Sequence, residues 1–317
     1  MFHNLERNKT VGRKILTTLF ALLLFSLLLG SQTVFAGAQA VVETSWLAEN
    51  LKKPGIKIVY VATTNQNDKA AFDGKHIPGS VYLDIPSLMG VVGSGNPPDK
   101  AGFEALMGKL GVSNSNHVII YTGFGGHSFG APFAAGTFWL MDYFGHNNVS
   151  ILNGGMKKWA DEKRETTSDP AKITPTAYKA AAPDASIFAD ADYVLKNIKN
   201  PKVALLDTRA HDEYTGANPL GNKRAGHIPG SVNVDYYITN LNPNETFKSV
   251  GDLKAAYESK GVTKDKEIIS YCQGGIRAAH SYVVLKYLLG YPKVRNYVGS
   301  IGEWANKLDP AKYPLEK

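Results

Sequence analysis

The sequence of 317 residues contains a single cysteine, Cys272, and the residue types around it are those that a reactive thiol requires. It follows a short apolar run at 268–271, which indicates a buried strand, and the residues after it form a short loop: Gln273, Gly274, Gly275, Ile276 and Arg277. Two glycines let the backbone turn with its N–H groups inward, and these groups and the start of a following helix stabilise a negatively charged sulfur. A buried structural thiol requires neither the glycines nor the arginine, so we predict that Cys272 is a nucleophile.

The elements that must position this loop alternate between strands and helices. Residues 203–206 and 268–271 are candidate buried strands, and Arg277 to Leu289 is an amphipathic helix that ends at Gly290. This alternation predicts an α/β fold with a mainly parallel sheet and helices on both faces. Ligands of such folds bind beyond the carboxyl ends of the strands, which is where Cys272 stands.

The chain repeats itself at long range. Residues 76–84 (HIPGSVYLD) match residues 227–235 (HIPGSVNVD), and two further segments match in the same order, 111–121 with 261–271 and 149–159 with 294–304. Three ordered matches predict two copies of one domain. The segment 165–186, rich in Thr, Pro, Ala and Lys, is the expected linker, so we predict domains at 37–164 and 187–317.

The first 36 residues have the composition of a secretory signal peptide. Four basic residues precede an apolar run from Ile15 to Leu29, and the segment ends in Val34-Phe35-Ala36, with small residues at the positions that a signal peptidase reads. The run is shorter than the ~20 residues of a comfortable membrane span, which favours cleavage over an anchor. We therefore expect an exported protein, periplasmic or extracellular, without stable membrane insertion after cleavage.

Composition excludes several other classes. Hydrophobic residues make up 44% and charged residues 20%, which is typical of globular domains and not of disorder or coiled coil. The net charge of +7 is diffuse, with no run of five or more Lys or Arg, so we expect no nucleic-acid partner. One cysteine excludes an internal disulfide framework and a Cys-rich metal site, and we expect no metal and no cofactor.

Taken together, these motifs resemble those of the rhodanese family, and the mature chain resembles a tandem-domain sulfurtransferase. The resemblance rests on the His-Ile-Pro-Gly-Ser segments, the turn Asp207-Thr208-Arg209, the loop Cys272–Arg277 and the ending Gly299 to Trp304. It implies two tandem rhodanese-like domains and ping-pong transfer of a sulfane sulfur. Cys272 would take sulfur from a small sulfur-containing anion such as thiosulfate, hold it as a persulfide, and pass it to a thiophilic acceptor such as cyanide, a thiol or a protein thiol.

The length of the loop separates this chemistry from that of a phosphatase. Related phosphatases use Cys-x5-Arg, which is wide enough for a phosphate, whereas Cys272 and Arg277 are separated by four residues. The smaller loop favours a sulfur atom.

The first copy has lost these residues. Thr122 aligns with Cys272, no arginine closes the segment after it, and Ala62-Thr63-Thr64 stands where Asp207-Thr208-Arg209 does. The resemblance implies that this domain is catalytically silent and helps to wall the site.

The sequence leaves more than one role possible for the charged residues near the nucleophile, which are Asp207, Arg209, Glu213 and Arg277. Arg209 and Arg277 would set the local field, but Arg277 either faces substrate or is tied to a carboxylate such as Asp207 or Glu213. Related enzymes that act on thiosulfate or mercaptopyruvate carry an arginine where this chain has Glu213. We expect this carboxylate, placed near the rim, to weaken binding of a dianionic donor, and Glu213→Arg to lower the KM for thiosulfate.

Several other residues have a structural interpretation first. His76 and His227 occur at matching positions in both copies, so we expect them to form structural hydrogen bonds. The same reasoning, or an apolar setting, predicts core positions for Trp159, Trp304 and the apolar helix 133–141. We expect His280, one turn into its helix, to be packed or solvated and not to act as a general base. We expect His127, in the Gly-rich segment of the first copy, to face the interdomain cleft.

Two hypotheses about function remain open. The first is an exported sulfurtransferase with Cys272 as nucleophile. The second is an exported persulfide carrier or redox-binding module that turns over small donors negligibly. A lone reactive thiol in an oxidising compartment requires shielding, so we expect Cys272 to be recessed at the interdomain cleft.

Overall fold

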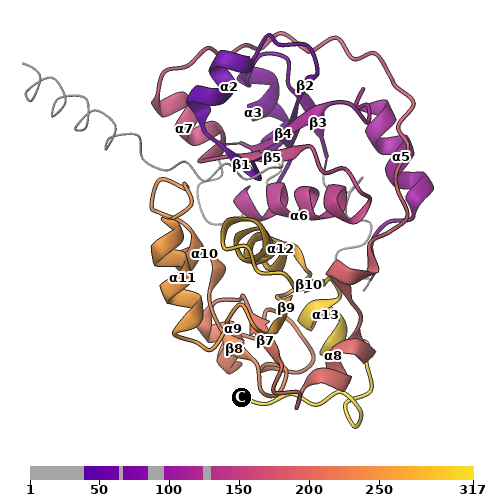
Figure 1. The fold of residues 1–317 in the computed structure, drawn as a ribbon, viewed down its shortest axis with the longest axis vertical. Coiled ribbons are helices and arrows are strands. Elements are labelled where there is room, and N and C mark those ends of the chain that lie inside the picture. Colours follow the sequence, from indigo (N-terminus) through magenta and orange to yellow (C-terminus); the bar gives the residue numbers. More distant parts are fainter. Residues whose placement is uncertain (1–38, 64–66, 85–95, 124–129) are drawn as a thin grey trace, which may run out of the picture. The chain divides into compact units, whose positions relative to one another are not determined.

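Two five-stranded parallel sheets form the framework of the chain (Figure 1). The structure is a computed structural model that describes residues 39–63, 67–84, 96–123 and 130–317. The first sheet has the order β1-β5-β4-β2-β3, and its strands are β1 (Val41–Val42), β2 (Ile56–Val61), β3 (Val81–Leu83), β4 (His117–Thr122) and β5 (Val149–Leu152). The second has the equivalent order β6-β10-β9-β7-β8, from β6 (Phe188–Ala189), β7 (Val203–Asp207), β8 (Val232–Asn233), β9 (Glu267–Tyr271) and β10 (Val294–Tyr297). The predicted α/β fold with two copies of one domain is confirmed.

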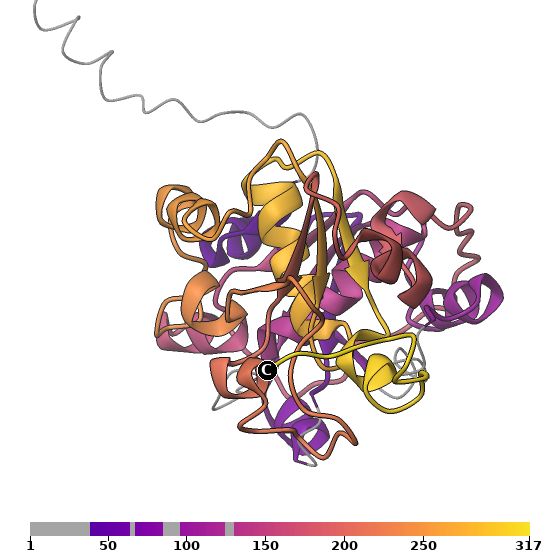
Figure 2. The ribbon, with the colours of Figure 1, turned by 90° about the horizontal axis from the view of Figure 1, so that it is seen from below.

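Helices cover both faces of each sheet, as Figures 1 and 2 show. The first domain contains α2 (Thr44–Asn50), α3 (Asp68–Gly74), α5 (Lys100–Lys109), α6 (Gly130–Tyr143) and α7 (Gly155–Asp161). The second contains α8 (Ala191–Asn197), α9 (His211–Thr215), α10 (Tyr236–Asn240), α11 (Val250–Glu258), α12 (Ile276–Val283) and α13 (Ser300–Trp304). The predicted helix after Cys272 is α12, and the π-helical turn Val284–Leu288 continues it.

The side chains of each central strand alternate between two cores, because successive residues of a strand point to opposite faces of its sheet. In β9, Ile268 contributes to a large central core and Ile269 to a smaller core beneath α8 and α13. Val118 and Ile119 of β4 divide in the same way between the central core and one beneath α2, α3 and α7. The central core contains residues of both domains, so the two domains share one apolar interior.

Helices α6 and α12 lie side by side in this central core, between the two sheets (Figure 1). Nearly all of α6 is buried, including Phe138, Trp139 and Met141, because the first sheet packs on one side and α12 on the other. The expectation that this apolar segment belongs to the core is confirmed. Within the described residues, no helix has the length and apolar composition needed to cross a membrane.

The repeated His-Ile-Pro-Gly-Ser segments anchor the ends of the central strands. In the second domain, Tyr271 Oη lies 2.7 Å from Ser231 Oγ and accepts from the Ile228 N–H at 3.2 Å. Tyr121 has the equivalent partners in the first domain, Ser80 Oγ at 2.9 Å and the Ile77 N–H at 3.2 Å. Tyr271 is the last residue of β9, and Tyr121 is the last but one of β4. In the second domain the repeated segment therefore holds the residue that directly precedes Cys272.

Candidate active site

Cys272 lies directly beyond the central strand of the second sheet. Strand β9 ends at Tyr271, which pairs with Asp207 at the end of β7, so the thiol stands at the carboxyl edge of the sheet. Only 1% of the Cys272 side chain is exposed. The expectation that the thiol is recessed is confirmed.

The backbone around Cys272 forms a cradle in which one amide is directed at the sulfur. The Gly275 N–H donates to Cys272 Sγ, with a nitrogen–sulfur distance of 3.1 Å. The Cys272 N–H donates to Ser300 Oγ at 3.0 Å, and the Cys272 carbonyl accepts from the Ile301 N–H at 3.0 Å. A donor directed at the sulfur can stabilise negative charge that develops there during reaction.

Two glycines allow the cradle to close. Gly275 adopts a φ of +86°, which side chains rarely adopt, and a Cβ there would lie 2.9 Å from the backbone of Val298. A Cβ on Gly302 would lie 2.6 Å from the Gln273 carbonyl oxygen, which accepts the Gly302 N–H at 2.8 Å. The second glycine of the predicted loop and the glycine of α13 are therefore both required by close backbone approach.

The first domain closes the cradle from the other side. A Cβ added to Gly136 of α6 would lie 3.5 Å from Cγ2 of Ile276, so α6 passes over the loop. Because α6 belongs to the first domain, this contact agrees with the expectation that Cys272 lies next to the boundary between the domains.

Arg277 is paired with Glu213, which resolves one of the alternatives left by the sequence. The two guanidinium nitrogens donate to the two carboxylate oxygens at 2.5 and 2.7 Å, and Glu213 is only 5% exposed. Burial lowers the pKa of Arg277, but the hydrogen bonds to Glu213 and the charge of Cys272 outweigh it, so the pKa is raised overall. The Glu213 carboxylate is therefore buried and paired, and an arginine at position 213 would face Arg277 inside the protein; the expected effect of this carboxylate on a dianionic donor stays a prediction.

Arg209 is also paired, with Asp207. Its Nε and Nη2 donate to the Asp207 carboxylate at 2.6 to 3.1 Å, and Nη2 donates to the Gly226 carbonyl at 2.9 Å. Both side chains are buried, with exposed fractions of 2% and 0%. These contacts tie the guanidinium to the turn at the end of β7. A direct role of Arg209 toward substrate stays a prediction.

Gln273 is held by a residue that the sequence analysis missed. Asn222 and Gln273 exchange hydrogen bonds between their side-chain amides, at 3.0 and 2.9 Å. Asn306 donates to the same Asn222 oxygen at 2.7 Å and to the Gly302 carbonyl at 2.9 Å. The side chain of Gln273 is thus part of a neutral amide network that fixes the loop. Asn222 lies in an ordinary loop sequence, and nothing in the residue types there signals this contact.

Tyr236 and Ser300 are two further residues of the site that sequence reasoning missed. The Tyr236 hydroxyl is buried and has no hydrogen-bond partner among the described residues. Burial raises the pKa of Tyr236, and the charges of Asp235 and Cys272 add to this against the effect of Arg277, so the ring lies within the field of the cradle. The signals were present in the sequence: Tyr236 follows one copy of the repeat where Ile85 follows the other, and Ser300 stands in the recognised ending of the second domain.

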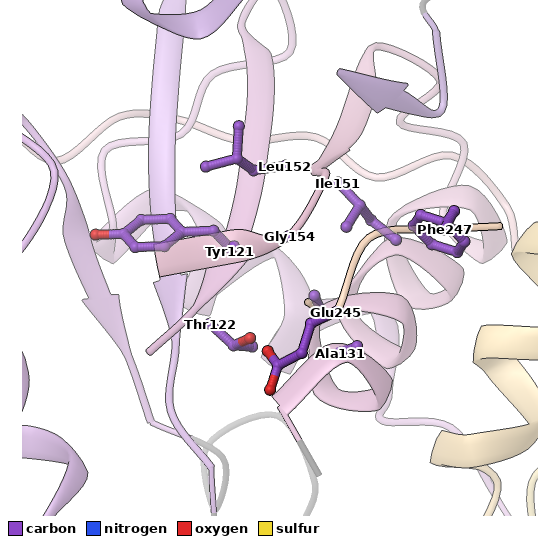
Figure 3. Close-up of a pocket in the computed structure, with 10 residues that line it drawn as sticks. Tyr121, Thr122, Ala131, Ile151, Leu152, Gly154, Glu245 and Phe247 are labelled. Atoms are coloured by element: carbon purple, nitrogen blue, oxygen red, sulfur yellow. The ribbon is translucent and has the colours of Figure 1, made fainter. Parts of the chain in front are cut away.

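The equivalent place in the first domain contains no thiol. Thr122, which aligns with Cys272, is the last residue of β4. A small pocket beside it is lined by Tyr121, Ala131, Gly154 and other residues of the first domain (Figure 3). Two residues of the second domain, Glu245 and Phe247, also line this pocket, and the Glu245 carboxylate points toward Thr122 (Figure 3). A loop of the second domain therefore covers the position that corresponds to Cys272. Thr64 and His127 both lie outside the described residues.

The remaining structural expectations agree with the structure. His76 Nδ1 lies 2.7 Å from the Phe72 carbonyl, and His227 Nδ1 lies 2.9 Å from the Tyr214 carbonyl. Trp159, Trp304 and His280 are fully buried or nearly so. Burial lowers the pKa of His280 to about 3, so its imidazole is neutral at physiological pH.

Comparison with known proteins gives one family for both halves of the chain. The family model described as a rhodanese-like domain matches residues 43–162 and 190–307. A sulfur carrier protein of Thermus thermophilus, TtuD, is 38% identical over 288 residues, which are 86% of this chain and 95% of that protein. A thiosulfate sulfurtransferase of Bos taurus is 33% identical over 285 residues, 86% of this chain and 94% of that protein.

Solved structures share the fold. The anaerobic ergothioneine biosynthesis enzyme of Chlorobium limicola, solved with trimethyl histidine, superposes with a TM-score of 0.76 at 22% identity. The match covers 88% of this chain and 70% of that one. At this identity the likeness concerns the fold alone.

Proposed function

Because the chain belongs to the rhodanese family, with two tandem rhodanese-like domains, we propose that it is a sulfurtransferase in which Cys272 carries the transferred sulfur as a persulfide. The observation that carries the proposal is the hydrogen bond from the Gly275 N–H to Cys272 Sγ, with a nitrogen–sulfur distance of 3.1 Å, at a thiol that is almost completely buried. Relatives described as thiosulfate sulfurtransferases and as a sulfur carrier support sulfur transfer as the general activity.

The reaction has two steps. The Cys272 thiolate attacks the sulfane sulfur of the donor, a sulfur–sulfur bond to Sγ forms, and the bond to the rest of the donor breaks with its electron pair leaving on that group. With thiosulfate the leaving group is sulfite. An acceptor such as cyanide or a thiol then attacks the outer sulfur, and Cys272 leaves as the thiolate. The Gly275 amide faces the thiolate sulfur before the first step; after it, the negative charge of the persulfide is on the outer sulfur, which is bonded to Sγ.

The test is thiocyanate formation with cyanide as acceptor, measured for the mature protein with thiosulfate and separately with mercaptopyruvate. Replacing Cys272 by Ser keeps the shape of the loop and removes the thiolate, so turnover should fall to the uncatalysed rate. Retained turnover in Cys272→Ser would remove this cysteine from the mechanism.

A second candidate is a persulfide carrier with negligible turnover of small donors. TtuD, the relative at 38% identity, is described as a sulfur carrier protein, which favours this alternative. It requires one sulfur on Cys272 by intact mass after exposure to donor, stable in the absence of a partner, with no multiple turnovers. The two candidates are separated by the number of thiocyanate molecules formed per protein.

We further propose that the first domain is silent and that its role is to cover the cradle. The support is Thr122 in the place of the cysteine and the passage of α6 over Ile276. Thr122→Cys in the Cys272→Ser background should give no sulfurtransferase activity. Turnover in that double variant would show that the first domain retains a working cradle.

We also propose export, with removal of residues 1–36. The support is the basic, apolar and small-residue pattern of this segment. Expression of the full chain in a bacterium, followed by fractionation and intact mass, tests the proposal. Full-length protein in the cytosolic fraction would contradict it.

A further inference from the structure

Every cation in the described loops around Cys272 already has a partner. Arg277 is bound through two nitrogens to Glu213, and Arg209 is bound through two nitrogens to Asp207. Asp235, at the start of α10, is a third acidic residue that interacts with Arg277. Two guanidinium groups are therefore each paired with a carboxylate around this site, and a third carboxyl group, Asp235, whose pKa is raised by burial, lies near Arg277.

The other basic residues of these loops are bound to backbone carbonyls. Lys223 Nζ donates to the Asn306 carbonyl at 3.1 Å, Lys248 Nζ to the Ile238 carbonyl at 2.5 Å, and Arg224 to the carbonyls of Trp304, Ala305 and Tyr313. Helix α6, which covers the loop, contains no Lys or Arg, and neither do the internal segments 64–66, 85–95 and 124–129. Within the described loops, no ammonium or guanidinium group is left to neutralise a second negative charge on a donor.

The groups that line the cradle are neutral instead. The Gln273 amide is paired with Asn222, and the Gly275 N–H is directed at Sγ. The Tyr236 hydroxyl is buried, has no partner in the described part of the chain, and is therefore available to a ligand. A buried donor without a partner carries a free-energy cost that a hydrogen bond from bound substrate would remove.

We propose that the preferred sulfur donor carries a single negative charge, as an organic persulfide or a thiosulfonate does, and that the Tyr236 hydroxyl donates a hydrogen bond to it. Dianionic thiosulfate is the poorer donor, because its second charge meets cations that are already paired with carboxylates. The inference rests on the proposed sulfurtransferase function and names the substrate class of that site.

The chemistry balances for each donor without an added oxidant or reductant. The Cys272 thiolate displaces the group bonded to the sulfane sulfur, and the bond to Sγ forms as the donor bond breaks. The leaving group departs with the electron pair, as a thiolate from a persulfide, a sulfinate from a thiosulfonate, or sulfite from thiosulfate. The product on the protein is the same persulfide anion in each case.

Methanethiosulfonate and thiosulfate form a matched pair of probes, because a methyl group in the first replaces one charged oxygen of the second. We expect kcat/KM for thiocyanate formation by the wild-type protein to be about tenfold or more higher with methanethiosulfonate, after each rate is divided by that donor's rate with a free thiol. A normalised ratio of one, or a preference for thiosulfate, would overturn the proposal.

Two variants test its parts. Glu213→Gln removes one carboxylate charge and keeps an acceptor for Arg277, so the ratio of kcat/KM for thiosulfate to that for methanethiosulfonate should rise about tenfold, whatever the variant does to both rates together. Glu267→Gln is the matched control, because Glu267 pairs with Arg295 at the opposite end of β9 and its loss should change neither donor. An equal effect of Glu213→Gln on both donors would contradict the charge argument.

Tyr236→Phe retains the ring and removes the hydroxyl, so kcat/KM for methanethiosulfonate should fall about tenfold while the free energy of unfolding is unchanged or higher. Unchanged kinetics would remove Tyr236 from donor binding. Failure of the proposed function looks different from either result: no donor would then produce thiocyanate above the level of Cys272→Ser.

Discussion

Ser300 and Gly155 occupy equivalent positions at the starts of α13 and α7, and their backbones have nearly the same φ, 52° and 51°. This left-handed conformation suits glycine and disfavours residues with a Cβ. The silent domain has glycine there, whereas the domain with Cys272 has serine. The Ser300 hydroxyl accepts the Cys272 N–H at 3.0 Å and donates to the Tyr297 carbonyl at 2.7 Å. The second domain thus has a residue with a Cβ in this unfavourable conformation, and there the hydroxyl of that residue orients the nucleophile.

Replacing Ser300 by Gly should separate activity from stability. The lost hydrogen bonds and the relieved backbone strain are each about 1 kcal/mol, so the free energy of unfolding in urea should change little. The Cys272 amide loses its partner, and kcat/KM for thiocyanate formation should fall about tenfold. Gly155→Ser is the matched control and should leave kcat unchanged. A full loss of stability in Ser300→Gly would mean that the serine is structural only.

The parts of the fold that follow from periodicity and repetition were predictable from the sequence. Strands β7 and β9 and helix α12 are found where apolar runs and an amphipathic pattern predicted them, because parallel strands buried on both faces are continuously apolar. The repeat predicted two copies of one sheet, and the glycines after Cys272 predicted a tight cradle. Each of these features is local in the sequence or is repeated within it.

The parts that depend on contacts between distant loops were not predictable. The partner of Arg277 was left open between two carboxylates, and only packing places Glu213 on it. Asn222 is 51 residues from Gln273, and a single amide in a loop gives no sign of its partner. Tyr236 departs from the other copy of the repeat, which the sequence shows, but its burial without a hydrogen-bond partner among the described residues is a property of the packed protein.

Gly302→Ala should displace the cradle. The added Cβ would lie 2.6 Å from the Gln273 carbonyl oxygen, which belongs to backbone and cannot rotate away. We expect a loss of about 1–3 kcal/mol in the free energy of unfolding and a larger relative loss of sulfur transfer, since the shifted residue is next to Cys272. Gly251→Ala in α11 is the control, because a Cβ there meets only Ser249 Oγ, at 3.8 Å, and should be stabilising or neutral. Equal effects of the two substitutions would refute the argument from close approach.

Asp142 of α6 joins the first domain to the second. Its carboxylate accepts hydrogen bonds from the hydroxyls of Tyr282 and Tyr287 and pairs with Lys286 at 3.2 Å. Burial first, and then the charge of Asp142, raise the pKa of both tyrosines, so they remain donors at any physiological pH. Removing the carboxylate leaves the hydroxyls of Tyr282 and Tyr287 without this acceptor and leaves Lys286 with only the Tyr282 hydroxyl, at 2.8 Å.

We therefore expect Asp142→Ala to lower the free energy of unfolding by about 2–5 kcal/mol and to loosen the contact of α6 with the cradle. The rate at which iodoacetamide alkylates Cys272 should rise, because α6 covers the loop at Ile276. Glu258→Ala on exposed α11 is a control that should change neither quantity. An unchanged alkylation rate in a destabilised Asp142→Ala protein would show that the domain contact does not shield the thiol.

His280 should make the stability of the protein depend on pH in a defined window. The ring is completely buried in α12, stacks on Phe247 with centroids 4.9 Å apart, and lies 3.2 Å from the Asn240 amide through Nδ1. Burial lowers its pKa from 6.5 to about 3. Because the folded-state pKa is depressed, the unfolded chain binds a proton below pH 6.5 that the folded chain does not. This stability is complete above pH 6.5 and declines as the pH falls toward 3.

The contribution of His280 should decline by about 1.4 kcal/mol for each pH unit within that window. His117 and His146, whose pKa values are also lowered by burial, add slopes of the same sign, so the total does not isolate His280. His280→Asn keeps an acceptor for Asn240 and cannot titrate, and the difference between wild type and this variant removes the shared slopes. Urea unfolding at pH 7.5, 6 and 5 should therefore give a variant whose stability, relative to wild type, improves as the pH falls. A constant difference across the three pH values would mean that His280 has the same pKa in the folded protein as in the unfolded chain and is not held neutral by burial.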